Sequence, residues 1–205
     1  MIKAVIFDFG NVICQYDNHL FTTAISGFSP LTERELYRLI YEQSDLPCLY
    51  ETGMISSGAF YEKLIRLCQL KVSKEAFISA YTGIFKPIIS TIQLIERLKE
   101  NYRIALLSNT NELHFSSVIK QQKVFGLFDA VSLSFEVKAM KPDRLIFDDC
   151  LNKLGLLPCE CIYIDDIQEY ADKATALGFE GIQYKTEQLL QQDLATKLKW
   201  NDYGI

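Results

Sequence analysis

The chain has 205 residues, a length that fits one domain or one domain with a modest insertion. Its net charge of −5 at pH 7 and its pI near 5.1 give no reason to expect nucleic acid or a membrane surface as a partner. No apolar stretch approaches the ~20 residues that cross a bilayer, and no signal peptide is apparent. The six cysteines form no metal-binding cluster beyond the weak pair Cys159 and Cys161, so we expect free thiols in a reducing cytoplasm.

The chain begins with a short apolar run that ends in a carboxylate. Residues Ala4 to Phe7 predict a strand buried on both faces, Asp8 follows directly, and Gly10 indicates a turn. Open α/β sheets bind their ligands at the carboxyl ends of strands. A lone aspartate in this place is more simply explained as a turn residue. Its interest therefore depends on the polar groups that end the other strands.

From about residue 17 to residue 100 the pattern is helical. Apolar residues recur three and four positions apart in the stretches 32–41, 57–68 and 73–81. An insertion directly after a strand that ends in a candidate site is well placed to act as a lid. We therefore expect an all-helical cap at residues 15–88, inserted into a core made by residues 1–14 and 89–205.

Strands and helices alternate in the rest of the chain. Helical stretches separate four predicted strands, which are residues 103–108, 130–134, 161–165 and 181–184. This alternation implies right-handed crossovers and a parallel sheet. The expected fold class is α/β, with a Rossmann-like parallel sheet that is interrupted after its first strand by the helical block.

Polar groups gather at the predicted carboxyl ends of these strands and in the loops beside them. They are Asp8, Ser108 with Asn109, Lys141, and the pair Asp165-Asp166. In a doubly wound sheet these ends meet in one crevice. The set combines a nucleophile, a hydroxyl donor, a cation and paired carboxylates, which suits the binding and transfer of a phosphoryl group.

The carboxylates predict a magnesium site. Mg²⁺ prefers oxygen ligands in octahedral geometry. We expect Asp8, Asp166 and the main-chain carbonyl of Gly10 to hold one ion, with Asp165 either on the ion or directly behind it. The sequence leaves open which aspartate of the pair binds the ion and which orients Lys141.

A bound phosphate would need hydrogen-bond donors at the same place. The Ser108 hydroxyl, main-chain N–H groups after each strand such as that of Asn109, and the Lys141 ammonium can supply them. Asp8 would then attack phosphorus and form an aspartyl-phosphate, while the metal and Lys141 offset the repulsion between the two anions.

These motifs resemble those of the haloacid dehalogenase-like (HAD) superfamily, and they occur in that family's order: Phe-Asp8-Phe-Gly-Asn-Val, Leu-Leu-Ser108-Asn, Lys141-Pro and Asp165-Asp166. The helical block is similar in place and size to a C1-type cap. Within the superfamily, the first motif and the stretch 50–56 are most similar to the bacterial α-D-glucose-1-phosphate phosphatase type. The resemblance implies the HAD fold and a phosphatase that uses Mg²⁺ and the nucleophile Asp8.

One position departs from the family pattern. Most phosphatases of the superfamily carry a second aspartate two residues after the nucleophile, as general acid and base, where this chain has Gly10. General acid–base catalysis contributes ~10²–10⁴-fold, so its loss slows turnover or moves the role elsewhere. Asp17 is one replacement to consider, although capping of the first cap helix is the simpler explanation for it.

The departure leaves two alternatives open. The 2-haloacid dehalogenases also lack the second aspartate, but they work without metal and do not carry the paired aspartate, and like charges such as Asp165 and Asp166 are costly to assemble without a cation. A catalytically weak or silent family member that acts by binding is the second alternative. The preferred function is Mg²⁺-dependent hydrolysis of a small phosphomonoester, such as a sugar phosphate.

The cap sequence suggests where the substrate is selected. We expect the loop from Tyr50 to Gly53 to face the nucleophile, with Tyr50 offering a ring and Glu51 an acceptor to a substrate hydroxyl. A plain interhelical turn with Glu51 in solvent explains the individual residues equally well. The expected partner is a small phosphorylated molecule, and the protein is expected to be a cytoplasmic monomer or homodimer.

Overall fold

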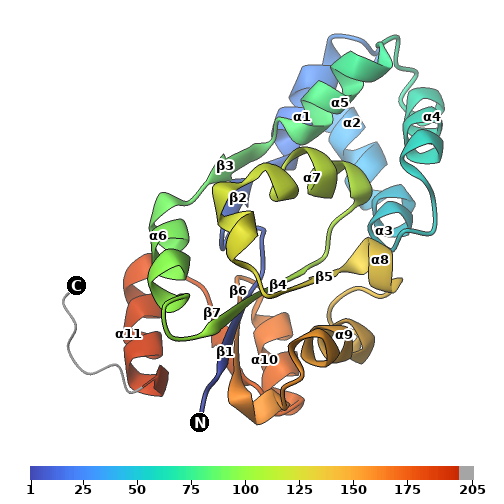
Figure 1. The fold of residues 1–205 in the computed structure, drawn as a ribbon. Helices are drawn as coiled ribbons and strands as arrows, with labels where there is room; N and C mark the ends of the chain where they lie inside the picture. Colours follow the sequence, from blue (N-terminus) through green and yellow to red (C-terminus); the bar gives the residue numbers. More distant parts are fainter. Residues whose placement is uncertain (199–205) are drawn as a thin grey trace.

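A five-stranded parallel sheet forms the centre of the computed structural model, which describes residues 1–198 (Figure 1). Its order is β5-β4-β1-β6-β7. The strands are β1 (Ala4–Phe7), β4 (Arg103–Ser108), β5 (Ala130–Leu133), β6 (Cys161–Asp165) and β7 (Glu180–Gln183). The chain order reverses at β1, so the carboxyl ends of β4, β1 and β6 border the crevice in which such sheets bind ligands. The expected α/β fold is confirmed.

Side chains of the central strand alternate between two buried layers. Val5 and Phe7 pack with α6 (Ile89–Leu98) and α11 (Glu187–Leu198), which cover one face of the sheet. Ala4 and Ile6 pack with α9 (Arg144–Leu154) and α10 (Gln168–Ala176) on the other face. Burial on both faces explains why β1 is a continuous apolar run. It also gives Asp8, the next residue, a rigid support.

The helical insertion spans residues 18–82 and has a core of its own. Its aromatic members include Phe21, Phe60, Phe77 and Tyr81, whose rings lie 5.0–6.5 Å apart. The helices are α1 (Asn18–Ser26), α2 (Glu33–Tyr37) with a π-helical turn (Arg38–Glu42), α3 (Leu46–Glu51), α4 (Ser57–Leu67) and α5 (Lys74–Thr82). The insertion therefore packs as a separate helical layer above the carboxyl edge of the sheet (Figure 1).

Side-chain caps fix the helix starts of the insertion. Thr32 and Glu35 form a reciprocal capping box at α2. Ser73 accepts the N–H of Ala76 at the start of α5. Asp17 accepts the N–H of His19 at the start of α1, so its capping role is confirmed and its carboxylate is already engaged. Each such cap contributes about 1 kcal/mol.

A short antiparallel ribbon joins the insertion to the sheet. It consists of β2 (Cys14–Tyr16) and β3 (Phe85–Pro87), and it pairs Tyr16 with Phe85. The sequence pattern did not predict this ribbon, because three residues per strand are too few for a periodic signal. The chain thus leaves and re-enters the sheet domain at adjacent points.

The remaining elements connect the strands. They are α7 (Glu112–Ser117), α8 (Ser134–Val137) and the 3₁₀ turns Ile119–Gln121, Lys123–Leu127 and Pro158–Glu160. The strand expected at residues 130–134 ends at Leu133, because Ser134 starts α8. None of the helices within residues 1–198 has the length and apolar character of a membrane span. All six cysteines are free thiols in the structure.

Candidate active site

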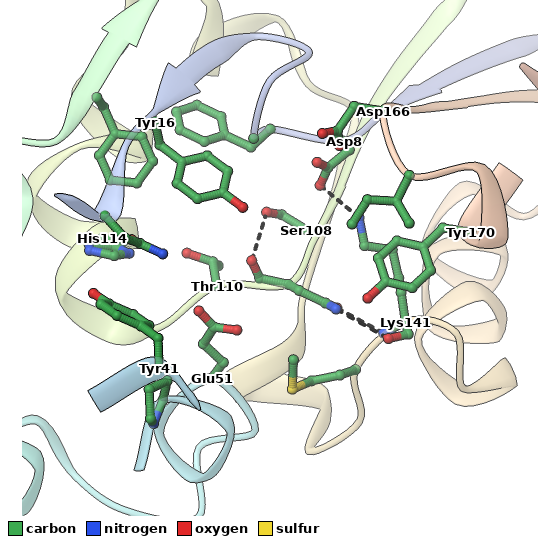
Figure 2. Close-up of a pocket in the computed structure, with 18 of the residues that line it drawn as sticks. Asp8, Tyr16, Tyr41, Glu51, Ser108, Thr110, His114, Lys141, Asp166 and Tyr170 are labelled. Atoms are coloured by element: carbon green, nitrogen blue, oxygen red, sulfur yellow. Dashed lines mark hydrogen bonds and ion pairs between the residues drawn. The ribbon is translucent and has the colours of Figure 1, made fainter. Parts of the chain in front are cut away.

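A cavity of about 300 Å³ lies between the carboxyl edge of the sheet and the helical insertion (Figure 2). The sheet side contributes Asp8, Ser108, Lys141 and Asp166, so four residues expected from the sequence meet in one place. The insertion contributes Tyr41 and Glu51, among others, on the opposite wall. This volume is at the lower end of the range for small-molecule sites.

Lys141 sits at the centre of the charged side chains. Its Nζ donates to Asp8 Oδ1 and to Asp165 Oδ2, both at 2.7 Å, and all three residues are buried. The ring of Tyr170 lies beside the ammonium, with its centroid 5.1 Å from Nζ. Lys138, which lies three residues before Lys141, instead donates to the Gly53 carbonyl at 2.7 Å. The structure thus brings Lys141, and not Lys138, to Asp8.

The paired aspartates have different surroundings. Asp165 is fully buried, and both of its carboxylate oxygens accept hydrogen bonds. One oxygen accepts from Lys141 and from the Tyr163 hydroxyl, and the other accepts the Ile167 N–H at 2.9 Å. Asp166 lines the cavity and accepts one side-chain hydrogen bond, at 3.0 Å from Asn11 Nδ2. The structure therefore places Asp165 on Lys141 and leaves Asp166 facing the cavity.

The charges of this cluster do not balance. One carboxylate oxygen from each of Asp8, Asp165 and Asp166 lies within 4.8 Å of the others, and Lys141 is the only lysine among residues 1–198 that contacts the group. Burial raises the pKa of Asp8 to about 7, with Lys141 opposing this rise and Asp165 adding to it. Burial likewise raises the pKa of Asp166. The raised pKa values show that the ionised carboxylates lack nearby positive charge. A bound cation would supply that charge and stabilise them in the ionised form.

The donor set fits Mg²⁺. Asp8 and Asp166 offer carboxylate oxygens, and Gly10 lines the same cavity with a carbonyl that accepts no hydrogen bond from any described residue. Oxygen-only donors suit a hard divalent cation. Asn11 adopts a left-handed conformation, with φ of 53°, and its side chain holds Asp166. Asparagine tolerates a positive φ better than most residues. Asn11 therefore both makes the turn and orients the Asp166 carboxylate.

Ser108 and Asn109 have different surroundings. Ser108 is buried at the end of β4 and its hydroxyl lines the cavity. The Asn109 side chain is engaged by the Lys141 backbone: its Oδ1 accepts the Lys141 N–H at 2.8 Å and its Nδ2 donates to the Lys141 carbonyl at 3.2 Å. Any contact of Asn109 with phosphate must therefore come from its main chain. Its side chain fixes the loop that carries the lysine.

A family model described as haloacid dehalogenase-like hydrolase matches residues 2–171. The chain belongs to the haloacid dehalogenase-like hydrolase family. The expectation drawn from the four motifs is confirmed.

Several relatives of this HAD-like hydrolase are phosphatases. It is similar to a D-ribitol-5-phosphate phosphatase of Bacteroides thetaiotaomicron, with 28% identity over 97% of this chain and 99% of the relative. It is 26% identical to a glyceraldehyde 3-phosphate phosphatase of Methanothermobacter thermautotrophicus, over 91% of this chain and 87% of the relative. Among solved structures, a HAD family enzyme of B. thetaiotaomicron in complex with magnesium and inorganic phosphate has a TM-score of 0.79 and 25% identity, covering 90% and 95% of the two chains.

The structure separates the two cap residues expected at the site of this HAD-like hydrolase. Glu51 lines the cavity and its carboxylate points into it (Figure 2). Tyr50 does not line it: the ring is buried against Phe60, 4.3 Å between centroids, and the hydroxyl accepts the Leu113 N–H and pairs with Ser57. The expectation that Tyr50 offers its ring to substrate is corrected, because neighbours on one helix point in different directions.

The stretch around Glu51 is held against the sheet domain. Ser134 Oγ donates to the Glu51 carbonyl at 2.6 Å, and Lys138 Nζ donates to the next carbonyl but one, that of Gly53. Gly53 has φ of 65° and a β-carbon there would lie 2.2 Å from the Phe135 carbonyl oxygen. Only glycine fits this close approach. The Glu51 carboxylate is therefore positioned by main-chain contacts to α8.

Glu51 carries a perturbed carboxyl group. Burial raises its pKa to about 7; Lys141 lowers it in part and the Asp8 carboxylate adds to the rise. In the unfolded chain the value returns to about 4.5. The folded protein therefore keeps a proton on Glu51 between about pH 4.5 and pH 7. Above pH 7 this carboxyl group must ionise although its surroundings disfavour the charged form.

We expect Glu51→Gln to become more stable than the wild type as the pH rises. Near pH 4.5 the two free energies of unfolding are similar, since Glu51 is neutral in the folded state. Above pH 7 the variant is more stable by about 1–2 kcal/mol, because one pKa unit corresponds to about 1.4 kcal/mol and part of the side chain stays solvated. Urea unfolding at pH 5 and pH 8 without phosphate measures this, with the exposed Glu62→Gln as control. A difference that does not change with pH would contradict the assignment.

His114 and Glu169 lie near the cavity in sequence or space, but neither presents a free side chain to it. His114 lines the cavity, but its Nε2 donates to the Tyr81 carbonyl and its Nδ1 accepts from Asn111, each at 3.1 Å. Burial lowers its pKa to about 4, so the ring is neutral at pH 7. Glu169 does not line the cavity, whereas Tyr170 beside it does.

Several site residues were not predicted, Tyr163 and Tyr16 among them. Tyr163 donates to Asp165 from two positions earlier on β6, and this spacing, which puts both side chains on one face of a strand, was a usable signal. Tyr16 lines the cavity from the ribbon, and burial, with help from the Asp166 and Asp8 charges, raises its pKa to about 12. No local pattern indicates its position, which depends on the turn at residues 11–13.

Proposed function

We propose that this HAD-like hydrolase hydrolyses a small phosphomonoester through an aspartyl-phosphate on Asp8. One observation carries the proposal: three carboxylates cluster at the carboxyl edge of the sheet, two of them paired with one buried lysine, beside a buried serine hydroxyl. Such a cluster suits a nucleophile, a metal and a dianionic substrate. The phosphatase relatives support it.

Each side chain of the cluster has its own role in the proposed reaction. Lys141 holds Oδ1 of Asp8, and Oδ2 lies on the Gly10 side of the carboxylate. This fixes the carboxylate for attack on phosphorus, while the lysine charge favours the ionised form that attacks. Asp165, held by Tyr163 and Ile167, keeps the lysine in place. The Ser108 hydroxyl and the main chain at Asn109 are the proposed donors to the phosphoryl oxygens.

We propose Asp8, Asp166 and the Gly10 carbonyl as the ligands of one Mg²⁺. When bound, the ion offsets the negative charge of the phosphoryl oxygens and of the two carboxylates. The structural relative that contains magnesium and phosphate supports this choice of cofactor. The dehalogenase alternative is weaker, because a halide-releasing site has no need for Asp166 beside an already buried Asp8–Lys141–Asp165 cluster.

The cavity lining points to a neutral, hydroxylated leaving group. Among the described residues that line the cavity, Lys141 is the only cation and His114 is neutral. The insertion side adds the Glu51 carboxyl group and the Tyr41 and Asn18 side chains. A second anionic group on the substrate would meet Glu51 without a partner. We therefore propose a small polyol or sugar monophosphate, with residues 15–88 as the cap that selects it.

A panel of esters tests the proposal. It contains polyol and triose monophosphates, a carboxylated phosphate such as phosphoglycolate, and a sugar bisphosphate, each assayed with and without Mg²⁺. Phosphate release from the neutral monophosphates, dependent on Mg²⁺, is the expected result. Halide release from 2-haloacids without metal would instead favour a dehalogenase, and metabolite binding without turnover would favour a binding protein.

Loss of the proposed ligand Asp166 has a defined expected result. We expect Asp166→Ala to raise the Mg²⁺ concentration for half-maximal activity by at least about 10–100-fold, since even groups behind the ligands contribute that much. Asn11→Gly keeps the Asp166 carboxylate and removes only the side chain that donates to it. The Mg²⁺ concentration for half-maximal activity should therefore rise less in this variant. The exposed Asp172→Ala serves as control. Unchanged Mg²⁺ dependence in Asp166→Ala would show that the ion is held elsewhere.

A further inference from the structure

Gly10 leaves space that another residue of this chain fills. A β-carbon built on Gly10 would lie 2.9 Å from Cε1 and 3.2 Å from Cδ1 of the Tyr16 ring, and 3.7 Å from Asp8 Oδ2. A real β-carbon essentially never comes within 3.0 Å of another heavy atom, so a side chain at position 10 would have to move the Tyr16 ring. Tyr16 in its observed position and a larger residue at position 10 therefore exclude each other.

The Tyr16 hydroxyl is available for a ligand. The ring is held by the ribbon, with Phe85 on the paired strand at 6.1 Å between centroids. Figure 2 shows the hydroxyl pointing into the cavity, on the side of Ser108 and Asp8. No residue of the described chain, 1–198, forms a hydrogen bond with it. An ordinary phenol is protonated at neutral pH and can donate.

We propose that Tyr16 is the proton donor to the leaving group, in place of the carboxylate that Gly10 cannot provide. The assignment rests on the proposed phosphatase function. As Asp8 bonds to phosphorus, the bond from phosphorus to the ester oxygen breaks and the electron pair stays on that oxygen, which takes the Tyr16 proton. In the second half, the phenolate takes a proton from water as the water oxygen bonds to phosphorus, and the Asp8 carboxylate leaves.

The other polar groups of the cavity are placed less well for this step. His114 has both ring nitrogens engaged, and Asp17 caps α1. Glu51 reaches the cavity from the opposite wall, where we place the organic part of the substrate. The Tyr16 ring lies beside Gly10, and its hydroxyl points to the side of the cavity that holds Ser108 and Asp8, so we place the ester oxygen beside this hydroxyl.

Leaving-group dependence tests the assignment. An alkyl phosphate needs a proton on its leaving oxygen, whereas p-nitrophenyl phosphate releases a stable phenolate. We expect Tyr16→Phe to lower kcat/KM about 100-fold or more for the best alkyl phosphate of the panel and less than about 3-fold for p-nitrophenyl phosphate. Tyr102→Phe, which removes the hydroxyl of a tyrosine that does not line the cavity, is the matched control and should show no difference between the two substrates.

A double variant gives an independent readout. Tyr16→Ala opens the space beside Gly10, so adding Gly10→Asp to it should restore at least about tenfold of the lost alkyl phosphatase activity, while Gly10→Asp alone meets the ring and gives no gain. Equal losses for both esters in Tyr16→Phe, or a leaving-group dependence found in Glu51→Gln instead, would overturn the Tyr16 role alone. Wild-type protein that hydrolyses neither ester would contradict the phosphatase function itself.

Discussion

Asp8→Asn is expected to abolish phosphate release from every ester while the protein remains folded. The amide cannot form the acyl phosphate, and removal of a covalent nucleophile costs at least about 10³-fold in kcat. The fold tolerates the change because burial already favours the neutral form of this carboxyl group. Steady-state turnover together with the thermal melting curve measures both parts of the expectation.

The control for Asp8→Asn is Asp148→Asn. Asp148 pairs with Arg144 on the surface of α9, so the same chemical change there should leave kcat within about twofold and stability within about 1 kcal/mol. Residual turnover above a few per cent in Asp8→Asn would mean that another group attacks phosphorus, or that water attacks directly. Either result would remove the aspartyl-phosphate from the scheme.

Lys141→Met is expected to cost both activity and stability. The substitution leaves Asp8 and Asp165 buried with no cation between them, and breaking a buried ion pair from one side typically costs about 3–5 kcal/mol. Turnover should fall by at least about 100-fold, because in the proposed mechanism the lysine both holds the nucleophile and faces the phosphoryl group. Chemical unfolding and kcat with the best substrate are the measurements.

A second lysine provides the matched control. Lys138→Met loses one hydrogen bond to the Gly53 carbonyl from an exposed side chain, for which we expect a cost of about 1 kcal/mol at most. Added Mg²⁺ should stabilise Lys141→Met more than it stabilises the wild type, since the ion would replace part of the missing charge. Equal stability losses in the two lysine variants would contradict the role of Lys141 as the centre of the cluster.

Residues that follow directly from a strand could be predicted from the sequence. Asp8, Ser108 and Asp165 each end an apolar run, and parallel strands bring such ends to one edge. Lys141 was expected at the site because Lys-Pro is one of the four family motifs, and Lys138 lies only three residues before it. The structure distinguishes the two lysines: Asn109 clamps the backbone of Lys141 and aims it at Asp8.

Contacts that depend on turns and short helices were beyond sequence reasoning. Tyr50 and Glu51 were treated as a loop in which both face the nucleophile, but they close the short helix α3, where adjacent side chains diverge by about 100°. The different surroundings of Asp165 and Asp166 arise because one lies inside β6 and the other just past it. Tyr16 is placed by a tertiary ribbon, so no spacing along the chain predicts it.

The β2–β3 ribbon makes the helical layer exchangeable in evolution. Its two strands run side by side, so the segment between them begins and ends at neighbouring points, with Tyr16 opposite Phe85. A segment with joined ends can be lengthened, shortened or replaced while the sheet keeps its register, because loop closure is already satisfied by the ribbon. The helical segment that lines the cavity can therefore change as one unit during evolution, without altering the strands that position Asp8, Ser108 and Asp165.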